Sequence, residues 1–207
     1  FPHSKTRLND QGVKTPFIIH YPELLKENNV VNSLISSIDI APTLLDIAEI
    51  EINDNFQGKS FYNLIKNPNQ KFRNYVFAEH NWHDYESYQR MVRNDRYLYI
   101  VNSRPEFPQE GPLDAINSPT YIDLKTAEKN NTITKIQAEI FIQPRQAEEL
   151  YDLSNDPYQF NNLISSEKIE DEYLLLKNIL NNWITETGDS KPIQITKDWY
   201  LREQEPF

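Results

Sequence analysis

Two runs of β-forming residues meet at a tight turn near the middle of the chain. Residues 88–93 and 97–101 contain aromatic and β-branched side chains, and Asn94 and Asp95 between them are typical turn residues. A connection this short joins neighbouring antiparallel strands. Together with a further strand-like run at residues 149–153, the pattern predicts an antiparallel sheet in the second part of the chain.

The first 70 residues have a different pattern. Residues 16–21 form a short apolar run that predicts a buried strand, residues 34–37 predict a second one, and Asp39 is a candidate N-cap of the helix that follows. A parallel sheet needs helices on both faces and several crossovers, so this piece is too small for an independent domain. We predict that residues 1–70 end a larger α/β domain and that residues 71–207 form an antiparallel-sheet subdomain.

Helical spacing returns in the second part. Residues 114–142 look helical in two pieces, interrupted at Pro119. Residues 167–186 carry apolar side chains at helical spacing, and Gly188 is in the position of a C-cap. We therefore expect helices packed against the antiparallel sheet.

The charge and composition of the chain exclude several kinds of partner. Thirty-one acidic against twenty-one basic residues give a formal charge of -10, which disfavours a nucleic-acid backbone. No run approaches the roughly 18 apolar residues of a membrane span, so we expect no membrane partner. The chain has no cysteine and therefore no thiolate nucleophile or ligand. It begins without Met, in sequence that looks internal to a larger protein.

Lys5 is the first candidate site residue. A lysine just ahead of a buried strand can act as a fixed point charge for a sulfate or phosphate oxygen. The alternative is a solvated lysine near a mobile end, and the pattern alone favours that alternative.

His80, His83 and Asp84 form the second candidate cluster, directly after a predicted strand. Zinc binding is a weak interpretation because no third His or Cys is spaced nearby. Two alternatives have equal weight. The histidines are either satisfied by the backbone of a surface loop, or they line a ligand pocket in which imidazole donates to an anionic or hydroxylated substrate.

Arg90 is the third candidate, because a forked guanidinium can meet a carboxylate bidentately. An exposed strand-face arginine is the simpler interpretation. Acidic pairs such as Glu148 and Glu149 are interpreted as solvated edges. No nucleophile elbow, Gly-rich phosphate loop or His-Glu-x-x-His motif occurs.

The chain as a whole resembles the sulfatase family. Residues 1–19 resemble the sulfatase segment in which a lysine precedes Leu-x-Asp-x-Gly-x-x-x-Pro, and residues 37–46 are similar to the Asp-Ile-Ala-Pro-Thr-Leu-Leu helix. Residues 78–86, 96–100 and 148–157 resemble the branch that contains heparan N-sulfatase. These motifs occur in the family's order, from residue 1 to about residue 190.

The resemblance implies an α/β fold of the alkaline-phosphatase-like sulfatase type, of which this chain is the C-terminal part. That part comprises the edge of the large α/β sheet, followed by a small antiparallel sheet with packed helices. In the family, a Cys or Ser in Cys/Ser-x-Pro-x-Arg becomes formylglycine, whose hydrate attacks sulfur beside a bound calcium ion. That motif is absent here. We expect calcium and formylglycine in an N-terminal part of the same sulfatase, with neither held by this chain, which should be inactive alone.

By position in the family's motif, Lys5 matches the basic residue that holds a sulfate oxygen. Relatives of the human heparan N-sulfatase have arginine at this position. His80 and His83 match the segment that closes over the sugar, with His83 the firmer match, and Asp84 follows as a hydroxyl acceptor. Which imidazole contacts the substrate stays open.

The resemblance therefore predicts a secreted or periplasmic sulfatase acting on a sulfated glycan, with N-sulfoglucosamine of a heparan-type chain as the first choice. A phosphodiesterase or phosphonate hydrolase of the same superfamily and a noncatalytic glycan-binding module are the alternatives.

Overall fold

The computed structural model describes residues 4–25, 28–84, 86–107 and 111–194. The chain divides into two compact units. The first, which we call the sheet unit, comprises Phe1–Lys14, Ala78–Val92 and Arg96–Phe207. The second, the helical unit, comprises Thr15–Phe77 and Arg93–Asp95. The prediction that residues 1–70 complete a larger α/β domain stays a prediction.

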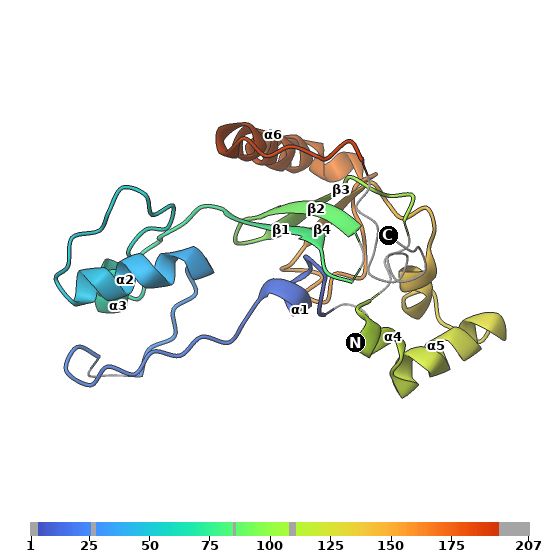
Figure 1. Cartoon of the computed structure of the whole chain (residues 1–207), viewed down its shortest axis with the longest axis horizontal. Helices are drawn as coiled ribbons and strands as arrows, with labels where there is room; N and C mark the ends of the chain where they lie inside the picture. Colours follow the sequence, from blue (N-terminus) through green and yellow to red (C-terminus); the bar gives the residue numbers. More distant parts are fainter. Residues whose placement is uncertain (1–3, 26–27, 85, 108–110, 195–207) are drawn as a thin grey trace, which may run out of the picture. The chain divides into compact units, whose positions relative to one another are not determined.

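The sheet unit is built on a meander of four strands. They are β1 (Val76–Trp82), β2 (Glu86–Arg93), β3 (Tyr97–Asn102) and β4 (Glu148–Asp152), all labelled in Figure 1. Their spatial order in the sheet is β1-β2-β3-β4. β3 and β4 are antiparallel, with Tyr97 opposite Asp152 and Val101 opposite Glu148. The antiparallel sheet predicted from the turn at Asn94 and Asp95 is confirmed.

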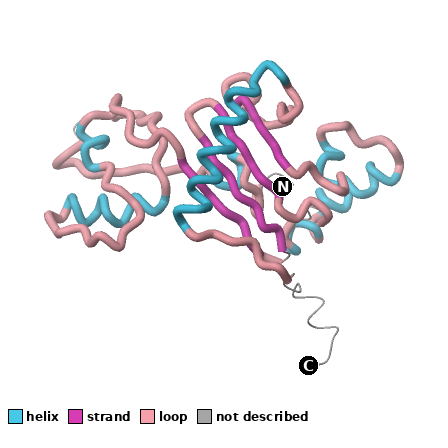
Figure 2. Tube along the Cα trace, turned by 90° about the horizontal axis from the view of Figure 1, so that it is seen from above, coloured by secondary structure: helices cyan, strands magenta, loops and turns pink. Residues whose placement is uncertain are grey.

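The two faces of this sheet are covered by different parts of the chain. Helix α6 (Glu170–Thr187) lies over one face, where the Tyr173 ring meets Tyr99 edge-on at 5.7 Å (Figure 2). It ends at Gly188, whose φ of 66° is left-handed and suits glycine, as predicted. On the other face Leu8 joins a core of four residues from the strands: Met91, Leu98, Ile100 and Tyr151. The short helix α1 (Asp10–Val13) follows Leu8.

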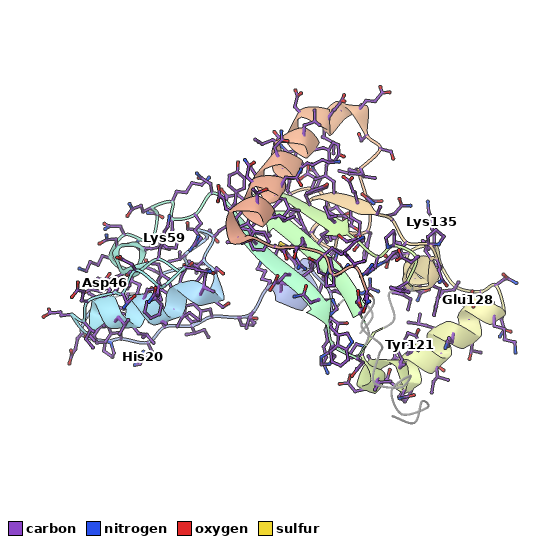
Figure 3. The ribbon with its side chains drawn as sticks, turned by 45° about the horizontal axis from the view of Figure 1, so that its top comes forward. His20, Asp46, Lys59, Tyr121, Glu128 and Lys135 are labelled. Atoms are coloured by element: carbon purple, nitrogen blue, oxygen red, sulfur yellow. The ribbon has the colours of Figure 1, made fainter. Side chains whose placement is uncertain are left out.

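The connection from β3 to β4 carries the remaining helices of the sheet unit before α6. They are α4 (Leu113–Ile116), α5 (Pro119–Lys129) and the 3-10 turn η2 (Gln137–Phe141); a further turn, η3 (Glu167–Ile169), leads into α6. The Ser118 side chain accepts a hydrogen bond from the Tyr121 N–H, and Pro119 begins α5, so the proline starts a helix here. Tyr121 and Glu128 mark the course of α5 in Figure 3.

The helical unit contains η1 (Ser37–Asp39), α2 (Ile40–Ile47) and α3 (Tyr62–Lys66), packed around Phe61, Leu64 and Ile65. The strand predicted at residues 16–21 is wrong: those residues form no strand, and Ile18 is 90% exposed. The strand predicted at residues 34–37 reduces to a single bridge between Leu34 and Arg73. An apolar run becomes a strand only where a neighbour takes its backbone hydrogen bonds, and the described residues supply none here.

The helical unit is organised around a buried carboxylate, Asp39, whose side chain is 0% exposed. It accepts hydrogen bonds from the N–H groups of Ser36 and Lys59, both at 2.8 Å, and from the guanidinium of Arg73, whose Nε lies 2.7 Å away. Burial alone would raise the pKa of Asp39, but these donors outweigh it and lower the pKa. One carboxylate thus holds three separate segments together.

We expect Asp39→Asn to lower the free energy of unfolding by about 3–5 kcal/mol, because it leaves the Arg73 charge without its partner. Asp54→Asn, at an exposed position of the same unit, is the matched control and should change stability by less than about 0.5 kcal/mol. Urea unfolding measures both. Equal stability of the two variants would contradict a central role for Asp39.

Candidate functional site

The first turn of α4 brings together two of the predicted site segments. Lys5 Nζ lies 3.0 Å from Asp114 Oδ2, and both side chains are exposed, at 54% and 69%. The neighbouring Leu113 N–H donates to Asp84 Oδ2 at 2.8 Å. The carboxylate of Asp84 therefore satisfies a backbone donor at the start of α4, while the next residue pairs with Lys5. This bond also places Asp84 beside the N-terminal segment.

His83 belongs to the same corner of the molecule. Its Nε2 lies 3.9 Å from Asp84 Oδ2, and its side chain is half exposed. At that distance the contact is too long for a hydrogen bond. Lys5, His83 and Asp84 thus form a partly open polar group, which we call the α4 corner.

His80 is in a different environment, on β1. Its Nδ1 lies 3.3 Å from Gln89 Oε1, and its Nε2 is buried with no hydrogen-bond partner among the described residues. Burial lowers the pKa of His80, and the positive charges of Arg145 and Arg7 and the nearby His83 lower it further, against the Gln89 hydrogen bond. The imidazole is therefore neutral at pH 7.

Arg90 is buried and has a structural partner. Its Nε and Nη2 meet the two carboxylate oxygens of Asp189 at 2.5 and 2.8 Å, directly after the C-cap of α6. Its guanidinium also lies over the Tyr88 ring, 4.1 Å from the centroid. Burial alone would lower the pKa of Arg90, but the bond to Asp189 raises it. These contacts anchor the end of α6 to β2, and they exclude the exposed strand-face arginine.

The sequence did not reveal a group of buried polar residues on the sheet face opposite α6. Glu149, interpreted as a solvated edge, is 7% exposed and accepts from Asn102 Nδ2 at 2.6 Å and from the Tyr151 hydroxyl at 2.7 Å. Arg7 and Arg145 are buried as well, and desolvation lowers the pKa of both, that of Arg145 to about 10. Alternation along β4 could have revealed Glu149, because it shares a face with the core residue Tyr151.

The described residues do not fit a metal centre or the formylglycine nucleophile. Within the part of the chain that the structure describes, no three His, Cys, Asp or Glu side chains gather where they could hold a metal ion. The sequence contains no Cys/Ser-x-Pro-x-Arg. In the same described part, no helix is both long and apolar enough to cross a membrane.

Comparison with known proteins shows the family to which the chain belongs. The family model described as "N-sulphoglucosamine sulphohydrolase, C-terminal" matches residues 3–107, about half of the chain, and this match includes Lys5 and the segment from His80 to Asp84. The chain belongs to this sulfatase family. The resemblance read from the sequence motifs is therefore confirmed.

Individual sulfatases match over most of the chain. An ulvan-active sulfatase of Formosa agariphila is 33% identical over 91% of the chain and 31% of its own length. The human N-sulphoglucosamine sulphohydrolase is 26% identical over 99% of the chain and 42% of its own length. The chain thus spans about a third of the first of these relatives.

Among solved structures, a 2-O GAG sulfatase matches with a TM-score of 0.51 at 23% identity, over 79% of the chain and 28% of that structure. This likeness supports the fold, and the predicted α/β fold of the alkaline-phosphatase-like sulfatase type is confirmed. By the description of the matching family model, the chain is a C-terminal sulfatase portion.

The neutral state of His80 predicts how stability depends on pH. Below the ordinary histidine pKa of about 6.5, the unfolded chain binds a proton that the folded imidazole binds only at lower pH. The free energy of unfolding should therefore fall as the pH drops from 7.5 to 5.5. His80→Asn should flatten this slope, whereas Gln70→Ala, at an exposed position without a titratable group, should leave it unchanged. Urea unfolding at several pH values measures this, and identical slopes for the wild type and His80→Asn would contradict it.

Proposed function

We propose that this chain is the C-terminal part of a sulfatase that hydrolyses sulfate from a sulfated glycan, with the sulfamate of N-sulfoglucosamine in a heparan-type chain as substrate. The family match over residues 3–107 carries the proposal, because it includes the segments that meet at the α4 corner. The formylglycine nucleophile and the calcium ion would come from the N-terminal part of the same sulfatase, which would be secreted or periplasmic.

Lys5 would hold a sulfate oxygen and stabilise the charge that develops as the S–N or S–O bond breaks. Its partner Asp114 is compatible with this role. An exposed ion pair of this kind is weak, so the ammonium can exchange a carboxylate oxygen for a sulfate oxygen. His83 and Asp84 would contact the sugar that carries the sulfate.

A second candidate substrate is a sulfate ester of ulvan. The identity to the ulvan-active sulfatase, 33%, exceeds the 26% to the human N-sulphoglucosamine sulphohydrolase. Assays of the complete enzyme with N-sulfoglucosamine, sulfated ulvan oligosaccharides and a phosphonate ester distinguish these substrates. Activity on the phosphonate alone would favour a phosphonate hydrolase, and no activity would favour a noncatalytic glycan-binding module.

In the complete enzyme, Lys5→Ala should raise the barrier to sulfate hydrolysis by about 2–4 kcal/mol, because one preorganised charge is lost. Steady-state kinetics measure the change in kcat/KM. Lys168→Ala, at an exposed position far along the chain, is the control and should retain wild-type rates. Wild-type kinetics for Lys5→Ala would remove this residue from the mechanism.

The N-terminal part of the enzyme would cover apolar side chains that the helical unit exposes, including Ile18 and Val30, which are 90% and 81% exposed. Co-expression of the two parts should allow them to purify together. We expect Ile18→Asp to weaken their association, and Ile122→Asp, on exposed α5, to leave it intact. Co-purification that is indifferent to Ile18→Asp would place the contact elsewhere.

A further inference from the structure

A row of buried hydrogen bonds crosses all four strands of the sheet unit. Asn102 on β3 donates to Glu149 on β4 at 2.6 Å, and Gln89 on β2 donates through Nε2 to Asn102 Oδ1. Gln89 Oε1 in turn faces His80 Nδ1 on β1 at 3.3 Å. We call Glu149, Asn102, Gln89 and His80 the cross-sheet relay. It lies on the face opposite α6, in line with the core residues Met91, Ile100 and Tyr151.

The direction of every bond in the relay follows from its β4 end. Asn102 Nδ2 faces two groups that can only accept, the carboxylate of Glu149 and the backbone oxygen of Gln146, each at 2.6 Å. The opposite amide orientation would put oxygen against oxygen at both contacts. Asn102 must therefore present its own oxygen to Gln89.

The same logic continues to β1. Gln89 has to turn its NH2 group to Asn102, so its oxygen is left for β1, where it also accepts from the Ser87 hydroxyl at 3.0 Å. An oxygen in that place needs a donor from His80. Nδ1 of His80 must carry the proton.

We propose that the cross-sheet relay fixes His80 in its Nδ1–H tautomer, so that Nε2 is a bare acceptor that recognises a sugar hydroxyl and does not bind the sulfate. The second half of this inference rests on the proposed function. It resolves which ligand group His80 can contact, because a lone pair repels the oxygens of a sulfate and attracts an O–H. Asn102, Gln89 and Glu149 are then positioning residues.

The unpartnered atoms of Arg145 are donors and that of His80 is an acceptor, so a group that contacts both residues has to accept and donate hydrogen bonds. Its Nη2 donates to the backbone oxygen of Ser87 at 3.1 Å, so the guanidinium lies beside the residue that shares the Gln89 oxygen with His80. Its Nε and Nη1 are buried without a partner in the described part of the chain, as is His80 Nε2. A hydroxyl can satisfy donors and an acceptor together. A sulfate cannot donate, and an ammonium cannot accept.

The tautomer can be read from two-bond ¹H–¹⁵N spectra of the full 207-residue chain with ¹⁵N-labelled histidine, since there are only four histidines. His80→Asn assigns the resonances. The wild type should show Nδ1 protonated and Nε2 unprotonated for His80. A protonated Nε2 in the wild type would overturn the proposal.

Variants on β3 and β2 separate the relay from simple packing. Asn102→Leu removes the acceptor that orients Gln89, so the His80 tautomer should shift toward Nε2–H. Asn181→Leu, the same change at an exposed position of α6, is the matched control and should retain Nδ1–H. Gln89→Met provides an independent route, because it removes the oxygen that faces Nδ1 and should release the tautomer in the same way. An unchanged His80 pattern in both Asn102→Leu and Gln89→Met would overturn the relay.

Ligand recognition is tested on the same spectra. Methyl glucoside, which has hydroxyls and no charge, should shift the Nε2 resonance, whereas inorganic sulfate at the same concentration should not. A shift with sulfate alone, or with neither probe, would overturn the recognition of a hydroxyl and leave Nε2 to a buried water. The tautomer is measured without turnover, so its outcome is independent of whether the complete enzyme proves to be a sulfatase.

Discussion

The sheet unit depends on one buried carboxylate, Glu149. Because this group accepts hydrogen bonds, it fixes the donor-to-acceptor direction of the row of side-chain hydrogen bonds that crosses the four strands. In a medium of low dielectric constant an unpaired polar group is costly, so a network of this kind is stable only when its members agree in direction. Glu149 accepts hydrogen bonds from Asn102 and Tyr151, and the positive charges of Arg7 and Arg145 lie within electrostatic range. The strands therefore pair in a register that both the apolar core and the polar row require.

The α4 corner shows how weak local elements can build a site together. Helix α4 has only four residues and little stability of its own. Asp84 satisfies one of its first backbone donors, and Asp114 in its first turn holds Lys5. The loop after β1 and the N-terminal segment thus both contact the first turn of α4, at Leu113 and Asp114.

The antiparallel sheet and α6 were predictable because alternation, turn residues and a C-cap glycine are local signals. The absence of a strand at residues 16–21 was not predictable, because whether an apolar run pairs depends on a neighbour that these residues do not specify. The exposure expected for Arg90 and Glu149 was wrong for a related reason. A charged side chain is expected to be exposed unless its partner is known, and the partners, Asp189 and Asn102, lie 99 and 47 residues away in the chain. The α4 corner was not predictable for the same reason, because Lys5 and its partner Asp114 lie 109 residues apart in the chain.

If the proposed function holds, Lys5 and His80 recognise different groups of the substrate: Lys5 binds the sulfate anion and His80 binds a sugar hydroxyl. Lys5 is charged, exposed and held by an exchangeable partner, which suits the recruitment of a sulfate oxygen. His80 is shielded, neutral and oriented from behind, which suits a fixed hydrogen bond to the sugar. On this proposal a protonated imidazole at position 80 would offer the sulfate a second positive charge. Burial, Arg145 and Arg7 all lower the pKa of His80, and a neutral imidazole leaves Lys5 as the cation of the pair.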